Sequence, residues 1–141
     1  MEVAAAGPEM LSRVPYYFQR RVNALEVGEL RARLPGDATI ERMIVRFYPG
    51  PELNLIVDPF IELPGNVRQE LIQYTGPRGI SGDNDMLEFG LSLPVRLDTS
   101  IVVGFNNLHA TLAYNFIVMV EVDFADGVWR WPFRLGSGGG K

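Results

Sequence analysis

Oxygen-bearing side chains that could hold a divalent cation gather at one point of the sequence. Residues 82–85 read Gly-Asp-Asn-Asp, and Glu88 follows three residues later. Calcium prefers such carboxylate and amide oxygens, but the run lacks the Asp-x-Asp-x-Asp-Gly spacing of a calcium loop. The pattern favours a tight acidic turn before a strand. We therefore predict no metal, although the residues leave open whether Asp83 and Asp85 bind calcium.

The other candidates for chemistry are scattered carboxylates and one histidine. Asp58, Asp98, Asp123 and Asp126 could form a site only if their loops converge. Two carboxylates can also hydrolyse glycosides, but such pairs arise by chance in a chain with 17 acidic residues. The chain has no cysteine, and a single histidine, His109, excludes multi-histidine zinc sites and histidine relays. His109 is expected in a solvated hairpin connection, and we predict no enzyme and no cofactor.

Aromatic and arginine side chains offer a different chemistry, which is recognition. Residues 14–21 read Val-Pro-Tyr-Tyr-Phe-Gln-Arg-Arg, a composition typical of protein interfaces. The segment is either an extended arm that adds to a neighbour's sheet or the first strand of its own domain. Trp129, Trp131 and Phe133 alternate near the other end, where they could stack on sugars, anchor a protein partner or close the core as a final strand. The predicted partner-binding residues are Tyr16, Tyr17, Phe18, Arg20, Arg21, Trp129 and Trp131.

Composition limits the kinds of protein that this chain can be. Its 141 residues, 47% of them hydrophobic and 21% charged, suffice for one folded domain with its own core. The net charge is −4, and the 12 arginines are not gathered into a basic stripe, which disfavours nucleic-acid binding. The first residues lack the features of a secretory signal, and the longest apolar stretch, residues 116–120, is too short to cross a bilayer. We expect a soluble, unprocessed protein.

The elements that must position these residues are strands, because apolar residues alternate with a period of two. The clearest run spans residues 112–124, where seven apolar positions share one face and the other face is apolar in its middle and acidic toward its end. A second strand is predicted at residues 86–95 and others at 52–63, 40–48 and 100–107. Pro59 lacks a ladder donor, so its strand is expected to lie at an edge or to bend there.

Turn residues separate these runs at intervals of about ten residues, which indicates a sandwich or barrel. Residues 66–73 could be a helix or a strand in a long connection, and residues 28–34 could be a weaker strand or a short helix. The predicted fold is all-β, an antiparallel β-sandwich of jelly-roll type with seven to nine strands. A flexible segment is expected at residues 1–14, then a single domain at 15–135 that includes a possible arm at 15–37. A flexible Gly-rich tail follows at 136–141, and whether it is native stays open.

The pattern resembles the small jelly-roll proteins of icosahedral virus and phage shells, that is, minor capsid or decoration proteins. The similarity covers about residues 38–125 and is carried by three segments: RFYPGPELNLIVDPFIEL, GISGDND leading into LEFGLSLPV, and IVVGFNNLHATLAYNFIVMVEVDF. The resemblance implies trimers at capsid symmetry axes, mobile arms that clasp neighbours, and no chemistry. The acidic balance favours a position on the outside of the shell.

These observations lead to one main hypothesis and two others. The chain is predicted to be a structural protein of a virion, soluble before assembly, that binds a capsid or similar assembly as a homo-oligomer, with a trimer favoured. The alternative is a carbohydrate-binding β-sandwich module that uses Trp129 and Trp131. A sugar-active enzyme is third. The partner and the oligomeric state stay open, because core and interface faces look alike in a strand with two apolar sides.

Overall fold

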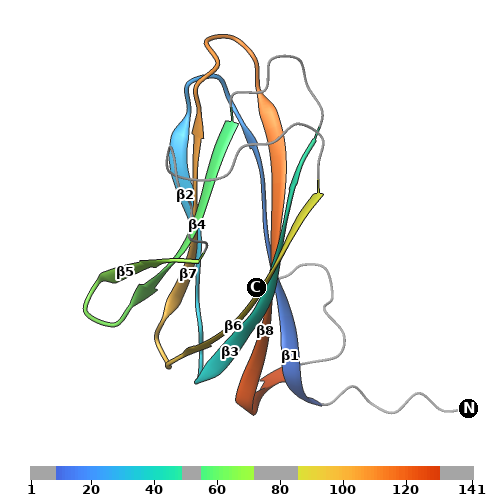
Figure 1. Cartoon of the computed structure of the whole chain (residues 1–141), viewed down its shortest axis with the longest axis vertical. Helices are drawn as coiled ribbons and strands as arrows, with labels where there is room; N and C mark the ends of the chain where they lie inside the picture. Colours follow the sequence, from blue (N-terminus) through green and yellow to red (C-terminus); the bar gives the residue numbers. More distant parts are fainter. Residues whose placement is uncertain (1–8, 49–54, 72–85, 131–141) are drawn as a thin grey trace, which may run out of the picture.

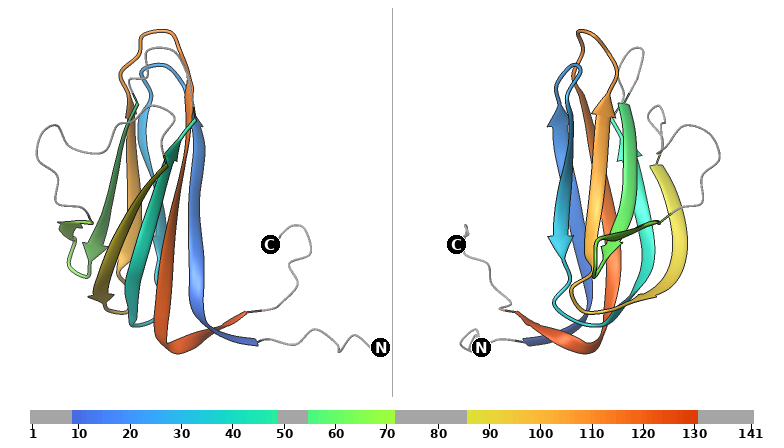
Figure 2. Two further views of the ribbon diagram at one scale, coloured as in Figure 1. Left: turned by 45° about the vertical axis from the view of Figure 1, so that its right-hand side comes forward. Right: turned by 90° about the vertical axis from the view of Figure 1, so that its left-hand side faces the viewer.

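The computed structural model describes residues 9–48, 55–71 and 86–130, and in these ranges the chain forms eight β-strands in two antiparallel sheets. The two sheets lie face to face as the layers of a sandwich (Figure 1, Figure 2). Strands alternate between the sheets along most of the chain, so no sheet is built from one continuous stretch. The bounds of the strands are β1 Glu9–Val22, β2 Val27–Arg33, β3 Ala38–Phe47, β4 Leu55–Leu63, β5 Val67–Glu70, β6 Met86–Val95, β7 Ser100–Asn107 and β8 Tyr114–Arg130.

The strand order identifies the sandwich as a jelly roll. The first sheet has the order β1-β8-β3-β6 and the second has the order β2-β7-β4-β5. The first strand therefore pairs with the last, the second with the second to last, and so on: β1 with β8, β2 with β7, β3 with β6 and β4 with β5. This is the result of rolling one long antiparallel hairpin into two sheets, and it is the jelly-roll arrangement. The predicted all-β jelly-roll sandwich with seven to nine strands is confirmed.

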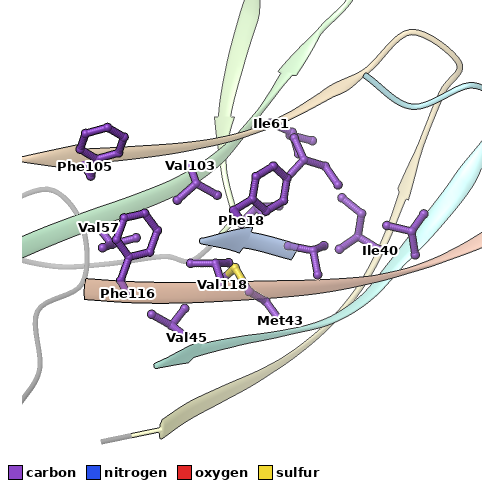
Figure 3. Close-up of a cluster of buried hydrophobic side chains, with 14 of the residues drawn as sticks. Phe18, Ile40, Met43, Val45, Val57, Ile61, Val103, Phe105, Phe116 and Val118 are labelled. Atoms are coloured by element: carbon purple, nitrogen blue, oxygen red, sulfur yellow. The ribbon is translucent and has the colours of Figure 1, made fainter. Parts of the chain in front are cut away.

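The core fills the space between the sheets with the residues that alternation assigns to one face. In β8, Phe116, Val118 and the other even-numbered apolar positions from 114 to 124 are buried, as predicted. Met43, Val45 and Phe47 of β3 are fully buried as well. Figure 3 shows side chains of β8 and β3 pointing toward Val57, Ile61, Val103 and Phe105 of the second sheet.

Pro59 shows how a central strand accommodates a residue without a donor. It lies in β4, which is flanked by β7 and β5, so β4 is not an edge strand and the edge option of the sequence prediction is wrong. The Pro59 carbonyl accepts a hydrogen bond from Leu71 N, just past the end of β5, whereas β4–β5 pairing begins only at Phe60. Because the N and the carbonyl of a residue in an antiparallel strand point to the same side, the missing donor faces the end of the short strand β5.

Strands occupy three segments for which the sequence left alternatives open. The helical options for residues 28–34 and 66–73 are wrong, because β2 and β5 lie there. β1 begins at Glu9 and pairs with β8, so it includes residues 9–14 of the segment expected to be flexible, with a register shift between Leu11 and Arg13. Residues 15–37, the possible arm, supply most of β1 and all of β2, so they form strands of their own domain. Residues 1–8 and the tail at 136–141 lie outside the described residues.

A tight turn at residues 64–66 separates β4 from β5. Pro64, Gly65 and Asn66 connect β4 to β5, and both Gly65 and Asn66 have positive φ, at 90° and 63°. Glycine and asparagine are the residues that adopt this left-handed conformation most readily. The turn therefore allows the tight reversal that places β5 beside β4 in the same sheet.

Candidate partner-binding face

Strand β1 divides the predicted aromatic and arginine cluster between two faces. Phe18 lies opposite Val118 of β8 and is only 5% exposed, so it is a core residue and is left out of any binding surface. Tyr16 also faces inward, with its ring centroid 6.4 Å from that of Phe124. Tyr17 points the other way and is 65% exposed. Alternation along a strand thus separates side chains that are neighbours in the sequence.

The two arginines of the cluster are divided in the same way. Arg20 lies at the margin of the core, with its guanidinium carbon 5.2 Å from the ring centroid of Phe105 and its charge paired with Glu26. Arg21 is exposed and lies opposite Asn115 of β8, on the same outward face as Tyr17. Tyr17 and Arg21 are therefore the two members of the β1 cluster whose side chains are available to a partner.

Strand pairing extends Tyr17 into an apolar strip across the outside of the first sheet. Tyr17 lies opposite Met119 of β8, and Met119 lies opposite Ile44 of β3. Ile117 is in the next outward position of β8, and all three aliphatic side chains are only half-buried. We call these four residues, Tyr17, Ile44, Ile117 and Met119, the outer strip. Large apolar side chains on an open sheet face are typical of a surface that contacts another protein.

Ion pairs border the outer strip toward the far end of β8, where that face becomes acidic. The carboxylate of Glu121 lies 3.5 Å from Arg13 and 3.4 Å from Arg42, and Arg42 also contacts Glu88 at 3.0 Å. These pairs are partly exposed, so each contributes little to stability. They form a polar rim beside the apolar residues, which is the usual layout of a protein interface.

The predicted tryptophan stripe falls largely outside what the structure describes. Trp129 belongs to the last part of β8, which pairs with the first residues of β1 after a register shift at residues 11–13. In Figure 1 and Figure 2 this end of β8 bends away from the sandwich together with β1. The backbone of Trp129 lies opposite Met10, whereas Trp131 and Phe133 are outside the described residues. The sugar-binding alternative that depends on this stripe stays a prediction.

A recess lies on the outside of the second sheet, and the sequence analysis did not predict it. It has a volume of about 230 Å³, and its floor is formed at Gly104, which lies opposite Glu29 of β2 and Asp58 of β4. Arg68 and Phe60 form one wall, with the guanidinium carbon 3.8 Å from the ring centroid. The signal in the sequence was Asp58, a charged residue inside the apolar run of β4. Only the pairing of the strands shows which residues lie beside it.

Asp58 has the most perturbed acidity of the described residues for which a shift is resolved. Burial is the main cause and the neighbouring Glu70 carboxylate the second, and together they raise its pKa to about 6 in spite of the adjacent Arg68. The carboxylate is 18% exposed, so water solvates it poorly. At neutral pH the Asp58 carboxylate is ionised in the folded state, and its burial carries a desolvation cost.

The folding stability should depend on the ionisation of Asp58 in a definite direction. Between the ordinary pKa of 3.8 and the raised value of about 6, the folded state binds more protons than the unfolded state, so stability falls as pH rises. Relative to Asp58→Asn, the free energy of unfolding of the wild-type chain should fall by on the order of 1–2 kcal/mol between pH 4 and pH 7. This figure allows for partial screening of the carboxylate by solvent. Urea denaturation at several pH values measures this difference.

Glu70→Gln provides the matched variant for this prediction. Removing the Glu70 charge should bring the pKa of Asp58 closer to its ordinary value, because Glu70 is the second cause of the shift. Carboxyl NMR titration reads the pKa directly. An Asp58 that titrates at its ordinary value in the wild-type chain would contradict the prediction.

The candidate metal ligands do not converge in the described structure. Asp58 lies on the outside of the second sheet and pairs with Arg68, whereas Asp123 lies on the outside of the first. Asp98 forms an ion pair with Arg33. Within residues 9–48, 55–71 and 86–130, no group of three or more acidic or histidine side chains is placed to hold a metal ion. Asp83 and Asp85 lie outside the described residues.

His109 has a structural task in the connection between β7 and β8. Its ring atom Nδ1 accepts hydrogen bonds from the backbone N of Thr111 at 3.1 Å and of Leu112 at 3.0 Å. The ring also meets Tyr114 edge-on, with 6.0 Å between the centroids. The position in a hairpin connection was predicted correctly, but the side chain is half-buried and orders the loop.

Comparison with known proteins finds only remote likenesses. No protein-family model matches the chain, and no curated protein does. A structure of infectious bursal disease virus, Gx strain, is similar over 85% of this chain with a TM-score of 0.39 and 8% identity. A mutant VP2 protein of the same virus, in derived particles, is similar over 85% with a TM-score of 0.39 and 11% identity. A VP2 subviral particle of the same virus is similar over 86% of this chain, with a TM-score of 0.33 and 8% identity.

This chain covers only 32%, 38% and 43% of those three viral chains. Their likeness to it is too remote to assign a family. The jelly-roll assignment therefore rests on the strand order described above. No helix within the described residues has the length and hydrophobicity needed to cross a membrane.

Proposed function

We propose that this protein is a structural component of an icosahedral virus or phage particle, a minor capsid or decoration protein that binds the shell as a homo-oligomer, with a trimer favoured. It would be soluble before assembly and lie on the capsid surface afterwards. The jelly roll supports this proposal without deciding it, because capsid proteins, lectins and cupins all use the fold.

The observation that carries the proposal is the outer strip. Its apolar side chains are presented on an open sheet face with a polar rim, and Tyr17 at its margin is 65% exposed. An apolar centre with an exposed aromatic residue and a charged border is the composition of a protein interface. Catalysis would instead need converging polar groups, and the outer strip has none.

The test is the native mass of the full chain, measured by light scattering and by native mass spectrometry. We expect a multiple of 15.8 kDa, with three copies in the favoured case. Tyr17→Glu should shift the population toward the monomer, because a charge would be desolvated in the interface. Val27→Glu is the matched control: Val27 is 70% exposed on the second sheet, so its replacement should leave the mass unchanged.

Two results would overturn the proposal. One is that the chain stays monomeric at every concentration and does not bind an isolated virus or phage shell. The other is an equal loss of assembly in Tyr17→Glu and Val27→Glu, which would move the interface away from the outer strip.

A further inference from the structure

We propose that a basic recess at one end of the first sheet's outer face binds carboxylate groups of an acidic peptide segment in a partner protein. The inference rests on the proposed function, because it assigns the chemistry of the partner that this face contacts. The recess has a volume of about 450 Å³ and is lined by Gln19, Arg20, Arg21, Tyr48, Asn115 and Phe116.

Strand pairing brings the lining residues together from three parts of the chain. Arg21 of β1 lies opposite Asn115 of β8, and the backbone N of Tyr48 donates a hydrogen bond to the Asn115 carbonyl at 3.2 Å. Arg46 of β3 stands beside this wall, with its guanidinium carbon 5.4 Å from the ring centroid of Tyr48. β8 lies between β1 and β3, so Arg21 in the recess and Arg46 beside it lie on the same face although they are 25 positions apart in the sequence.

The pattern of ion pairs singles out these two arginines. The structure describes the side chains of nine arginines, and six of them form ion pairs with carboxylates: Arg13, Arg20, Arg31, Arg33, Arg42 and Arg68. Of the described arginines, Arg21, Arg46 and Arg96 have no such pair. Two of these three flank the same recess, in a chain whose acidic residues outnumber its basic ones by 17 to 13. Among the described residues that line the recess, none is a carboxylate that could neutralise them.

The recess also presents neutral donors suited to a carboxylate. The side-chain amides of Gln19 and Asn115 and the hydroxyl of Tyr48 can each donate a hydrogen bond. An arginine guanidinium binds a carboxylate through two parallel N–H···O bonds, which gives direction as well as charge. Arg20 adds little, because Glu26 already neutralises it.

An acidic peptide fits this surface better than a nucleic acid. Two uncompensated arginines supply too few phosphate contacts for a polyanion, and the net charge of −4 repels one. The recess adjoins the outer strip through Ile117, which lies opposite both Gln19 and Arg46. A segment that alternates acidic and apolar residues would place carboxylates in the recess and an apolar side chain beside Ile117, at the end of the strip that adjoins the recess.

The experiment measures the binding of a fluorescein-labelled peptide of alternating glutamate and leucine by fluorescence anisotropy, with a lysine and leucine peptide as the charge-reversed probe. We expect the full chain to bind only the acidic peptide. The Arg21→Ala/Arg46→Ala double variant should weaken binding at least tenfold, about the effect of losing 1.4 kcal/mol. Arg96→Ala removes an arginine that also lacks an ion pair but lies elsewhere, and should change the affinity less than about twofold.

Several outcomes would overturn the inference. They are the absence of binding to the acidic peptide, an equal loss in Arg96→Ala, or tighter binding of a single-stranded oligonucleotide than of the peptide. The native mass separates this inference from the proposed function. An oligomer that fails to bind the peptide overturns only the basic recess, whereas a monomer that binds it, and binds no shell, overturns only the assembly role.

Discussion

Replacing Phe116 with alanine is expected to lower the free energy of unfolding by about 3–5 kcal/mol. Phe116 is fully buried and belongs to β8, which lies between β1 and β3 in the first sheet. Its ring centroid lies 5.9 Å from that of Phe105 on the second sheet. The substitution removes apolar contacts and leaves a cavity between the two layers. Because domains of this size are stable by only about 5–15 kcal/mol, the loss should be plain in a urea denaturation curve.

Ile117→Ala is the matched control for this prediction. Ile117 is the next residue of β8, but it points outward and is only half-buried. Its truncation should cost about 1 kcal/mol or less, since water already reaches the site and no closed cavity forms. Equal losses for the two variants would contradict the assignment of the inner and outer faces of β8.

Asn107→Leu is expected to destabilise the fold by about 2–4 kcal/mol, although leucine has nearly the same volume. Asn107 is the last residue of β7 and is fully buried. Its Nδ2 donates to the carbonyls of Val22, Asn23 and Leu112 at 3.3, 3.1 and 2.8 Å, and its Oδ1 accepts from the backbone N of His109 at 2.9 Å. One amide thus joins the β1–β2 and β7–β8 connections.

Leucine would leave these buried carbonyls without a donor, which is the costly way to lose a hydrogen bond. Urea denaturation gives the total effect, and hydrogen exchange locates it: the amide of Leu25, which donates to the His109 carbonyl at 3.2 Å, should exchange faster. Asn106→Ala is the control, because the Asn106 side chain has no hydrogen bond among the described residues, and it should cost about 0.5 kcal/mol or less. A neutral Asn107→Leu would show that solvent satisfies the carbonyls.

Asn107 also shows where local sequence patterns mislead. Residues 106 and 107 form an Asn-Asn pair, which is typical of a turn, and the turn does follow. The sequence does not show that one of the two amides is buried and bonded to backbone 84 and 85 residues away. Only the packing of β1 beside β8 brings those carbonyls to the end of β7.

Alternation of apolar and polar residues was enough to predict the inner faces of β3, β6 and β8, since a strand that buries one face must alternate in this way. The three consecutive aromatic residues of β1 hide that period, so only pairing with β8 decided that Phe18 enters the core and Tyr17 faces outward. The basic recess depended on tertiary structure for the same reason. Alternation is a local property of one strand. Arg21 and Arg46 lie near one recess only because β8 lies between β1 and β3, which are distant in the chain.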